Sequence, residues 1–165
     1  MKIAKYKNFS LQLLLLVAFL HLFACVQAQT ISGKVVRVID GDTIEILSGG
    51  TRYRIRLNGI DCPEKQQAYG NEATKFVMDL CLQKKVTAKI IGTDRYDRHL
   101  AEIILSNGHN LNRELVKYGY AWHYKRYSND KTLDRLEKSA RQQKIGLWAN
   151  PKAIPPWEFR RKNFH

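Results

Sequence analysis

Cysteine and proline are scarce in this chain of 165 residues, which contains three cysteines, four prolines and ten glycines. Three cysteines are too few to hold a small fold together by a disulfide framework. The low glycine and proline content excludes a collagen-like chain. Hydrophobic residues make up 44% of the sequence and charged residues 26%, close to ordinary globular usage. We therefore expect one compact domain with at most a short appendage.

Acidic residues are also few, and none occurs before Asp40. The chain has 28 Lys and Arg residues against 15 Asp and Glu residues, which gives a formal net charge of +13. A protein with this excess of positive charge favours an acidic partner. Nucleic acid, an anionic membrane surface and another polyanion all satisfy that requirement.

The longest apolar run, residues 11–24, is too short for a typical membrane-spanning helix, which needs about 20 apolar residues. Three lysines precede this run, and Val26–Ala28 places small residues at the positions read before a cleavage site. This order is typical of a secretory signal peptide. It predicts a cleaved signal at residues 1–28, a mature chain starting at Gln29 and export to the periplasm or the medium.

Two other interpretations of the N-terminal region remain open. The sequence Leu22–Cys25 is similar to a bacterial lipoprotein box, in which Cys25 would be acylated. An uncleaved anchor is the third interpretation. The mature protein is expected to lack a membrane association unless Cys25 carries a lipid.

Five short runs rich in β-branched residues predict five strands. Two of them lie between Ile31 and Leu47 and are joined by the tight step Asp40–Asp42. Apolar residues alternate with arginines in the third, 52–57, and the last two are 86–91 and 100–105.

Helical spacing of apolar residues predicts three helices. The first covers Tyr69–Leu82, the second is capped by Asn110 and ends near Gly119, and the third contains Leu133 and Ala140. Five short strands with three α-helices predict a small α+β fold, a five-stranded barrel of the OB type covered by helices. This domain is expected at residues 29–150, followed by a basic tail at 151–165 without a usable hydrophobic period.

Five of the fifteen acids fall within 25 residues: Asp40, Asp42, Glu45, Asp61 and Glu64. A solvated charged surface is the simplest interpretation, and an Asp before Gly commonly starts a turn. Asp42 and Asp61, however, both lie at strand ends. If those ends are neighbours, two like charges converge and require a cation or a shared proton. Carboxylate and carbonyl ligands favour Ca²⁺ or Mg²⁺ rather than zinc.

Two arginines complement these acids. Arg56 precedes Asp61 by five residues, and Arg98 lies where a loop enters the next strand. Arginines that converge on a metal-carboxylate cluster are suited to binding phosphate oxygens. Glu64 is then free to hold a water molecule for attack on phosphorus.

Four motifs in this order resemble the staphylococcal nuclease (thermonuclease) family. They are Ile39–Thr43, Arg56–Glu64, Tyr69–Gly70 and Asp94–Arg98, and the resemblance covers roughly residues 31–148. It implies an OB barrel with three helices. It also implies Ca²⁺-dependent hydrolysis of DNA and RNA, leaving 3′-phosphate ends.

The resemblance also implies roles for individual residues. It assigns calcium ligation to the carboxylates of Asp42 and Asp61 and to the carbonyl of Cys62, water activation to Glu64, phosphate binding to Arg56 and Arg98, and nucleotide contacts to Arg95 and Tyr96. Two positions depart from the family's type member, which has Thr at the position of Cys62 and Gly at the position of Asp97.

Two functional hypotheses follow. The first is an exported, monomeric, calcium-dependent nuclease. The second is a non-catalytic OB-type nucleic-acid-binding module, which requires the basic charge but not the acids. Retained carboxylates argue against the second, because acids beside a phosphate track weaken binding unless a cation intervenes. The aromatic residues at 118–124 are either base-stacking groups or packing groups of the barrel.

Overall fold

The computed structural model describes residues 29–163. The predicted signal peptide at 1–28, with Cys25 and the cleavage site, lies outside the described residues. Within residues 29–163, no helix has the length and apolar character needed to cross a membrane.

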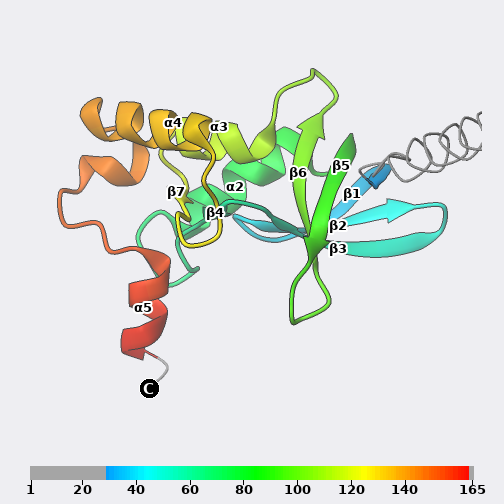
Figure 1. The fold of residues 1–165 in the computed structure, drawn as a ribbon, viewed down its shortest axis with the longest axis horizontal. Coiled ribbons are helices and arrows are strands. Elements are labelled where there is room, and N and C mark those ends of the chain that lie inside the picture. The colour runs from blue at the N-terminus through cyan, green and yellow to red at the C-terminus, as the bar shows by residue number, and fades with distance from the viewer. Residues whose placement is uncertain (1–28, 164–165) are drawn as a thin grey trace, which may run out of the picture.

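Five strands form a closed barrel, which confirms the predicted OB-type architecture (Figure 1). The strands are β1 (Thr30–Asp40), β2 (Thr43–Ser48), β3 (Thr51–Leu57), β5 (Lys85–Thr93) and β6 (His99–Leu105). Their order around the barrel is β1-β2-β3-β6-β5. The β3–β6 pair is parallel and the other pairs are antiparallel.

A second, two-stranded sheet lies beside the barrel and was not expected from the sequence. It pairs β4 (Ile60–Asp61) with β7 (Trp122–His123), so that Asp61 lies opposite Trp122. Both strands are only two residues long. Segments this short carry no hydrophobic alternation, and only the tertiary fold reveals them.

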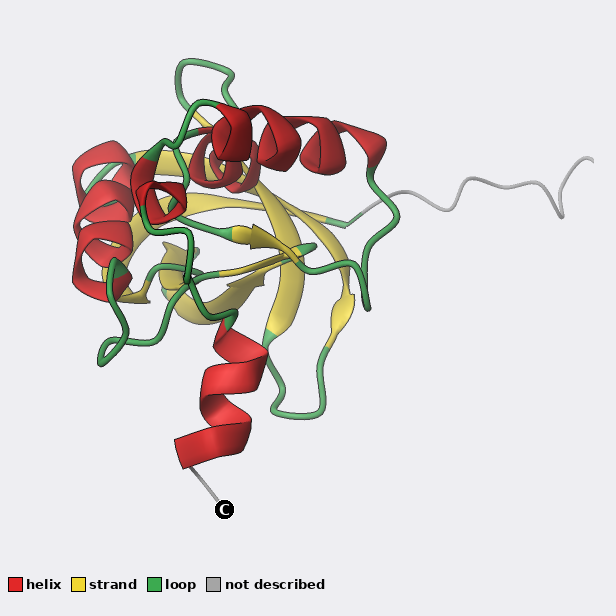
Figure 2. Cartoon of the chain, turned by 90° about the vertical axis from the view of Figure 1, so that its left-hand side faces the viewer, coloured by secondary structure: helices red, strands yellow, loops and turns green. Residues whose placement is uncertain are grey.

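The three predicted helices are present as α2 (Gly70–Cys81), α3 (Leu111–Lys117) and α4 (Lys131–Gln142). The predicted cap of α3 is confirmed, since the Asn110 side chain accepts a hydrogen bond from the Arg113 backbone N–H at 3.2 Å. A 3-10 turn, η1 (Gly146–Ala149), follows α4. Figure 2 shows these helices packed around the strands.

The C-terminal tail differs from the sequence expectation because it contains a further α-helix, α5 (Pro156–Asn163). Pro156 occupies the first helical position, where a missing backbone N–H costs nothing. Trp157 anchors the helix by stacking on Tyr124, with ring centroids 5.1 Å apart and planes 4° from parallel. Figures 1 and 2 both show α5 projecting from the same end of the molecule as the β5–β6 loop.

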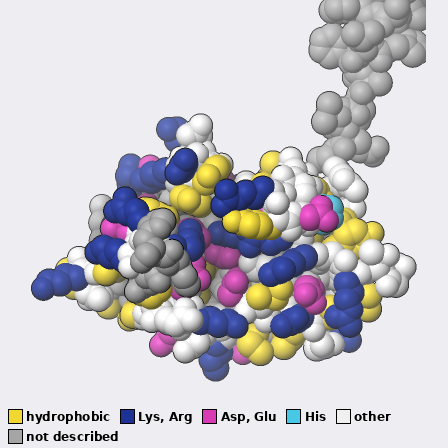
Figure 3. Space-filling view, turned by 90° about the horizontal axis from the view of Figure 1, so that it is seen from below, with side chains coloured by type: hydrophobic (Ala, Val, Ile, Leu, Met, Phe, Trp, Pro, Cys, Tyr) yellow, Lys and Arg dark blue, Asp and Glu magenta, His cyan; other side chains and the backbone are white. Residues whose placement is uncertain are grey.

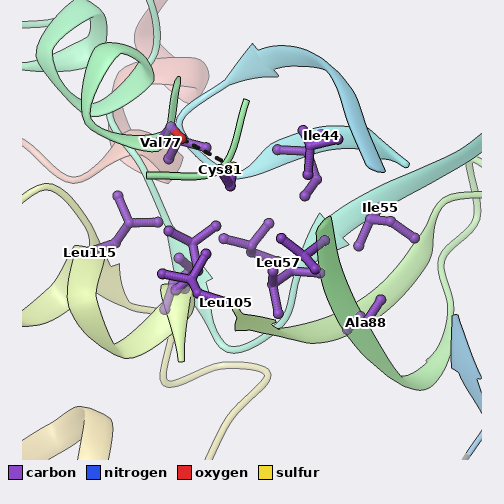
Figure 4. Packing of buried hydrophobic residues seen from close by; sticks show 14 of the residues in the cluster. Ile44, Ile55, Leu57, Val77, Cys81, Ala88, Leu105 and Leu115 are labelled. Carbon is purple, nitrogen blue, oxygen red and sulfur yellow. Dashed lines mark hydrogen bonds between the residues drawn. The ribbon is translucent and has the colours of Figure 1, made fainter. Parts of the chain in front are cut away.

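The core fills the barrel and the space under α2 and α3 (Figure 4). Ile44, Ile55 and Leu57 point inward from the strands, and Val77 and Leu115 contribute from the helices. All five side chains are almost wholly buried. Arg56, between two inward-facing residues of β3, is therefore directed to the outside of the barrel.

Cys62 and Cys81 are both buried and both free, so the structure contains no disulfide between them. Burial raises the pKa of the Cys62 thiol well above its usual value and raises that of Cys81 to about 12. Both thiols therefore stay protonated at neutral pH and pack as small apolar groups.

Candidate active site

Asp42 lies in the turn between β1 and β2, and this turn is held against the rest of the site. The Asp42 backbone N–H donates to Asp40 Oδ1 at 3.0 Å. Gly41 packs so closely that an added Cβ would lie 2.8 Å from the Cys62 Cβ and 2.9 Å from the Ala73 Cβ. Glycine is therefore required here for the turn to approach β4 and α2.

Asp61 lies on β4, which runs alongside that turn, and its side chain is only 1% exposed. The next residue joins the two segments directly, because the Cys62 backbone N–H donates to Asp42 Oδ2 at 2.8 Å. The sequence hypothesis that the two strand ends are neighbours is thus correct.

Arg56 connects the two carboxylates through one nitrogen. Its Nη2 atom is 3.1 Å from Asp42 Oδ2 and 2.9 Å from Asp61 Oδ1. Its Nη1 atom donates to the carbonyls of Leu57 at 2.8 Å and Ile60 at 3.0 Å. A guanidinium has five N–H donors, and protein oxygens accept from both terminal nitrogens here. In this arrangement Arg56 primarily holds the carboxylates together.

Burial dominates the electrostatics of this pair. Desolvation raises the pKa of Asp42 to about 7; the Arg56 guanidinium opposes the shift, and the nearby carboxyls of Asp40 and Asp61 reinforce it. Burial works against the charge on Arg56, but the attraction of Asp42 and Asp61 outweighs it and raises the Arg56 pKa. Burial is thus the main reason that Asp42 retains its proton, and further positive charge would stabilise its ionised form.

Glu64 lies in the loop that follows β4, and two hydrogen bonds and one close contact fix that loop. The Glu64 N–H donates to Gln67 Oε1 at 2.8 Å, and the Gln67 N–H donates to the Glu64 carbonyl at 2.8 Å. Gly70, the first residue of α2, packs directly against the Glu64 carbonyl, where a Cβ would overlap it. The Glu64 side chain is one-third exposed and thus accessible to a ligand.

Arg160, on α5, completes the cluster and was missed by the sequence analysis. Its Nη2 is 2.8 Å from Asp61 Oδ2, and its Nη1 is 2.7 Å from Glu64 Oε1. Burial opposes the charge on Arg160, but its hydrogen bonds to Asp61 and Glu64 raise its pKa. The only sequence signal for this residue is the Pro-led helix start at Pro156 within a basic tail.

Arg98 is the last residue of the β5–β6 loop and lies outside this cluster. Its Nε and Nη2 atoms donate to Asp94 Oδ2 at 2.8 and 2.7 Å. Burial of Asp94 opposes ionisation, but its hydrogen bonds with Arg98 and Tyr96 lower its pKa. Among residues 29–163, no hydrogen bond or ion pair joins Arg98 to Asp42, Asp61 or Glu64. The predicted convergence is therefore shown for Arg56 but not for Arg98.

Asp97, which stands where the family's type member has Gly, adopts a positive φ of 58°. Gly adopts this conformation without strain, and Asp is among the residues that tolerate it. The neighbouring acid that binds Arg98 is Asp94 rather than Asp97.

Arg95 and Tyr96 are at the tip of the β5–β6 loop. Arg95 Nη2 is 2.7 Å from the Tyr96 hydroxyl, and Tyr96 is 64% exposed. That these two residues contact nucleotides stays a prediction. The exposed position of Tyr96 is compatible with such a contact. On the face shown in Figure 3, acidic side chains lie between surrounding Lys and Arg side chains.

The aromatic residues at 118–124 mostly serve packing. Trp122 is buried against Trp148 with ring centroids 4.3 Å apart, and Tyr120 packs on Phe76 at 4.7 Å. Tyr118, 42% exposed, is a more accessible member of this run. Barrel packing is therefore the better interpretation for Trp122 and Tyr120.

The donor set of the site fits a hard divalent cation. Two carboxylates that share one guanidinium nitrogen, next to the backbone of Cys62, provide oxygen ligands of the kind that Ca²⁺ and Mg²⁺ accept. Within the described part of the chain, no group of three or more His, Cys, Asp and Glu side chains is arranged to hold a metal. Further ligands would therefore be carbonyl groups and water. The raised pKa of Asp42 also shows that more positive charge would stabilise its ionised form.

The family comparison matches residues 54–150, a segment that contains Arg56, Asp61, Glu64 and Arg98, to the family described as Staphylococcal nuclease homologue. The chain belongs to this family. The resemblance noted in the sequence motifs is thereby confirmed, and the closed five-stranded barrel agrees with it.

Several curated proteins are similar over most of their length. An uncharacterized endonuclease of Escherichia coli O157:H7 is 44% identical over 132 residues, which cover 80% of this chain and 86% of the relative. An uncharacterized endonuclease of Haemophilus influenzae is 40% identical, covering 90% of this chain and 83% of the relative. A micrococcal nuclease of Shigella flexneri is 39% identical, with coverages of 78% and 80%.

The raised pKa of Asp42 predicts a specific pH dependence of stability. An unfolded Asp42 loses its proton near 3.8, and the folded one loses it near 7. Between these values the folded state binds the extra proton, so this carboxyl makes the free energy of unfolding fall as the pH rises. Urea unfolding in chelator at about pH 5 and about pH 8 should show a smaller loss of stability in Asp42→Asn than in the wild type.

Asp79→Asn provides the matched control, because Asp79 is an exposed carboxylate on α2 that pairs with Lys75 across one helical turn. This variant should keep the wild-type loss of stability between the two pH values. An equal loss in the Asp42 and Asp79 variants would contradict the assignment of the raised pKa to Asp42.

Proposed function

We propose that this protein is a calcium-dependent nuclease that hydrolyses DNA and RNA and leaves 3′-phosphate ends. The observation that carries the proposal is the buried pair Asp42 and Asp61, which share one nitrogen of Arg56. Arg160 links Glu64 to this pair, because it binds both Glu64 and Asp61. Membership of the nuclease family and relatives named endonuclease and micrococcal nuclease support it. The net charge of +13 suits a nucleic-acid substrate.

Each residue has a distinct task in this proposal. Asp42, Asp61 and the carbonyl of Cys62 would hold Ca²⁺, which neutralises charge on the phosphate when bound. Glu64 accepts a proton from the attacking water as the new oxygen–phosphorus bond forms and the bond to the 5′ oxygen breaks. Arg98 would donate to a phosphate oxygen and support the departing 5′ oxygen. Arg56 would also donate to a phosphate oxygen, for which it would have to share or release some of its bonds to Asp42, Asp61 and the two carbonyls. Positioning and charge stabilisation of this kind account for most catalysis of phosphoryl transfer.

To bind a phosphate, Arg98 must release or share its present partner, Asp94. Its guanidinium is held by Asp94, so a phosphate oxygen would have to compete with that carboxylate or share Arg98 with it. Arg98 has further N–H donors beyond the two that Asp94 accepts, because a guanidinium carries five. Arg95 and Tyr96, at the tip of the same loop, would then contact the adjoining nucleotide.

Cleavage should require both the divalent cation and the Glu64 carboxylate. We expect the protein from Gln29 onward to degrade plasmid DNA and RNA in Ca²⁺ but not in chelator. Glu64→Gln should lower the rate by about 10²-fold or more, since general base catalysis contributes that much. Gel analysis measures the cleavage rates of the wild type and the variant, and mapping of the product ends identifies the 3′-phosphate.

Glu72→Gln is the matched control, because Glu72 is an exposed glutamate in the first turn of α2, eight residues along the chain. It should retain wild-type activity. Binding of nucleic acid with a steep salt dependence but without cleavage in Ca²⁺ would contradict the proposal and favour a non-catalytic binding module.

We also propose that the protein is exported and processed after Ala28. The support is the sequence order alone, with lysines before a short apolar run and small residues at 26–28. Intact-mass measurement of the protein from the producing cell should give a chain starting at Gln29. A mass that fits a diacylated chain starting at Cys25, or an uncleaved chain, would contradict it.

A further inference from the structure

We propose that Arg160 is a positioning residue that holds the Glu64 carboxylate in place for attack on phosphorus; the inference rests on the nuclease function proposed above. It assigns a role in the site to the C-terminal helix α5, which lies outside the family match at residues 54–150.

The helix α5 is fixed to the body of the protein before it reaches the site. Trp157 stacks on Tyr124 and meets Trp122 edge-on, with ring centroids 5.1 and 5.8 Å apart. Trp122 is itself paired to Asp61 across the β4–β7 ladder. The start of α5 therefore packs against β7, the strand paired with the one that carries the buried carboxylate.

The segment before α5 also holds the loop that carries Glu64. Gln67 Nε2 donates to the Ile154 carbonyl at 3.1 Å, while Gln67 Oε1 accepts from the Glu64 N–H. Arg160 Nη1 then binds Glu64 Oε1 at 2.7 Å. The backbone and the side chain of Glu64 are thus both tied to the C-terminal segment.

The guanidinium of Arg160 fixes the Glu64 carboxylate relative to the buried carboxylate of Asp61. The Nη2 atom donates to Asp61 Oδ2 at 2.8 Å, and the Nη1 atom donates to Glu64 Oε1 at 2.7 Å and more weakly to Asp61 Oδ1 at 3.4 Å. Asp61 is almost fully buried, whereas Glu64 is one-third exposed. Because an arginine fork presents its donors in a fixed geometry, it sets the distance and the angle between the two carboxylates.

This contact is compatible with the water-holding task of Glu64. A carboxylate has about four lone-pair sites on two oxygens. Arg160 contacts only Oε1, so the other oxygen can accept a hydrogen bond from water. The Arg160 side chain is 38% exposed, so it has room to adjust when a cation binds Asp61. The rival role is an inhibitory one, in which Arg160 blocks Asp61 from a cation.

The test compares Arg160→Met, Arg160→Lys and the matched control Arg161→Met, which removes an exposed arginine from the same helix. We expect Arg160→Met to lower kcat by about 10²-fold with KM within about threefold, as a small misplacement of a catalytic group does. Arg160→Lys should recover part of the loss, since lysine restores the charge but not the fork. Arg161→Met should leave kcat unchanged.

Amide hydrogen exchange supplies a readout that does not depend on activity. The amides of Glu64 and Gln67 should exchange at least about threefold faster in Arg160→Met than in the wild type, in the presence and absence of Ca²⁺, because their loop loses a charge-assisted contact. The amides of the barrel strands should exchange at wild-type rates, which shows that the fold is intact.

Several results would overturn the inference. Unchanged exchange at Glu64 and Gln67 would show that Arg160 does not hold the loop. A rise in activity or in Ca²⁺ affinity in Arg160→Met would establish the inhibitory role instead. If the wild type and Arg161→Met both fail to cleave nucleic acid, the proposed function fails, and the exchange data alone decide whether Arg160 positions Glu64.

Discussion

The site depends on one shared nitrogen, the Nη2 atom of Arg56, which binds both Asp42 and Asp61. Two carboxylates this close repel each other, and burial makes the repulsion stronger. The fold nevertheless keeps the two carboxylates close. Gly41 lets the β1–β2 turn pack on the end of β4, and the Cys62 N–H donates to Asp42. Burial of Asp42, reinforced by Asp40 and Asp61, raises its pKa, so a bound cation would stabilise the ionised carboxylate.

The C-terminal helix connects the buried carboxylates to the loop that carries Glu64. Asp61 is contacted from the barrel side by Arg56 and from α5 by Arg160. Arg160 also binds Glu64, so a single arginine connects the proposed metal ligand to the proposed water-binding group. The site is therefore assembled from a turn, two strands, a loop and a terminal helix, and each of these segments supplies a charge whose partner lies in another.

The sequence predicted those parts whose signal is local. β-Branched runs and helical periods predicted the barrel and α2, α3 and α4, and the strand-end positions of Asp42 and Asp61 predicted their convergence. The ladder of β4 and β7 was missed because two-residue strands have no period. Helix α5 and Arg160 were missed because the helix depends on the stacking of Trp157 on Tyr124, a tertiary contact. Arg98 was expected at the cluster but pairs with Asp94, a partner that spacing alone does not reveal.

Calorimetric titration of the protein with Ca²⁺ tests the central claim most directly, because the claim is that the buried pair binds a cation. The account predicts one bound Ca²⁺ per chain near pH 7. Protons should be released on binding, because the cation displaces the proton that the raised pKa of Asp42 retains. Binding should be lost in Asp61→Asn. It should be kept in Asp79→Asn, because that substitution removes an exposed carboxylate on α2 that lies outside the site. Ca²⁺ binding that survives Asp61→Asn unchanged, or no binding by the wild type, would contradict the account.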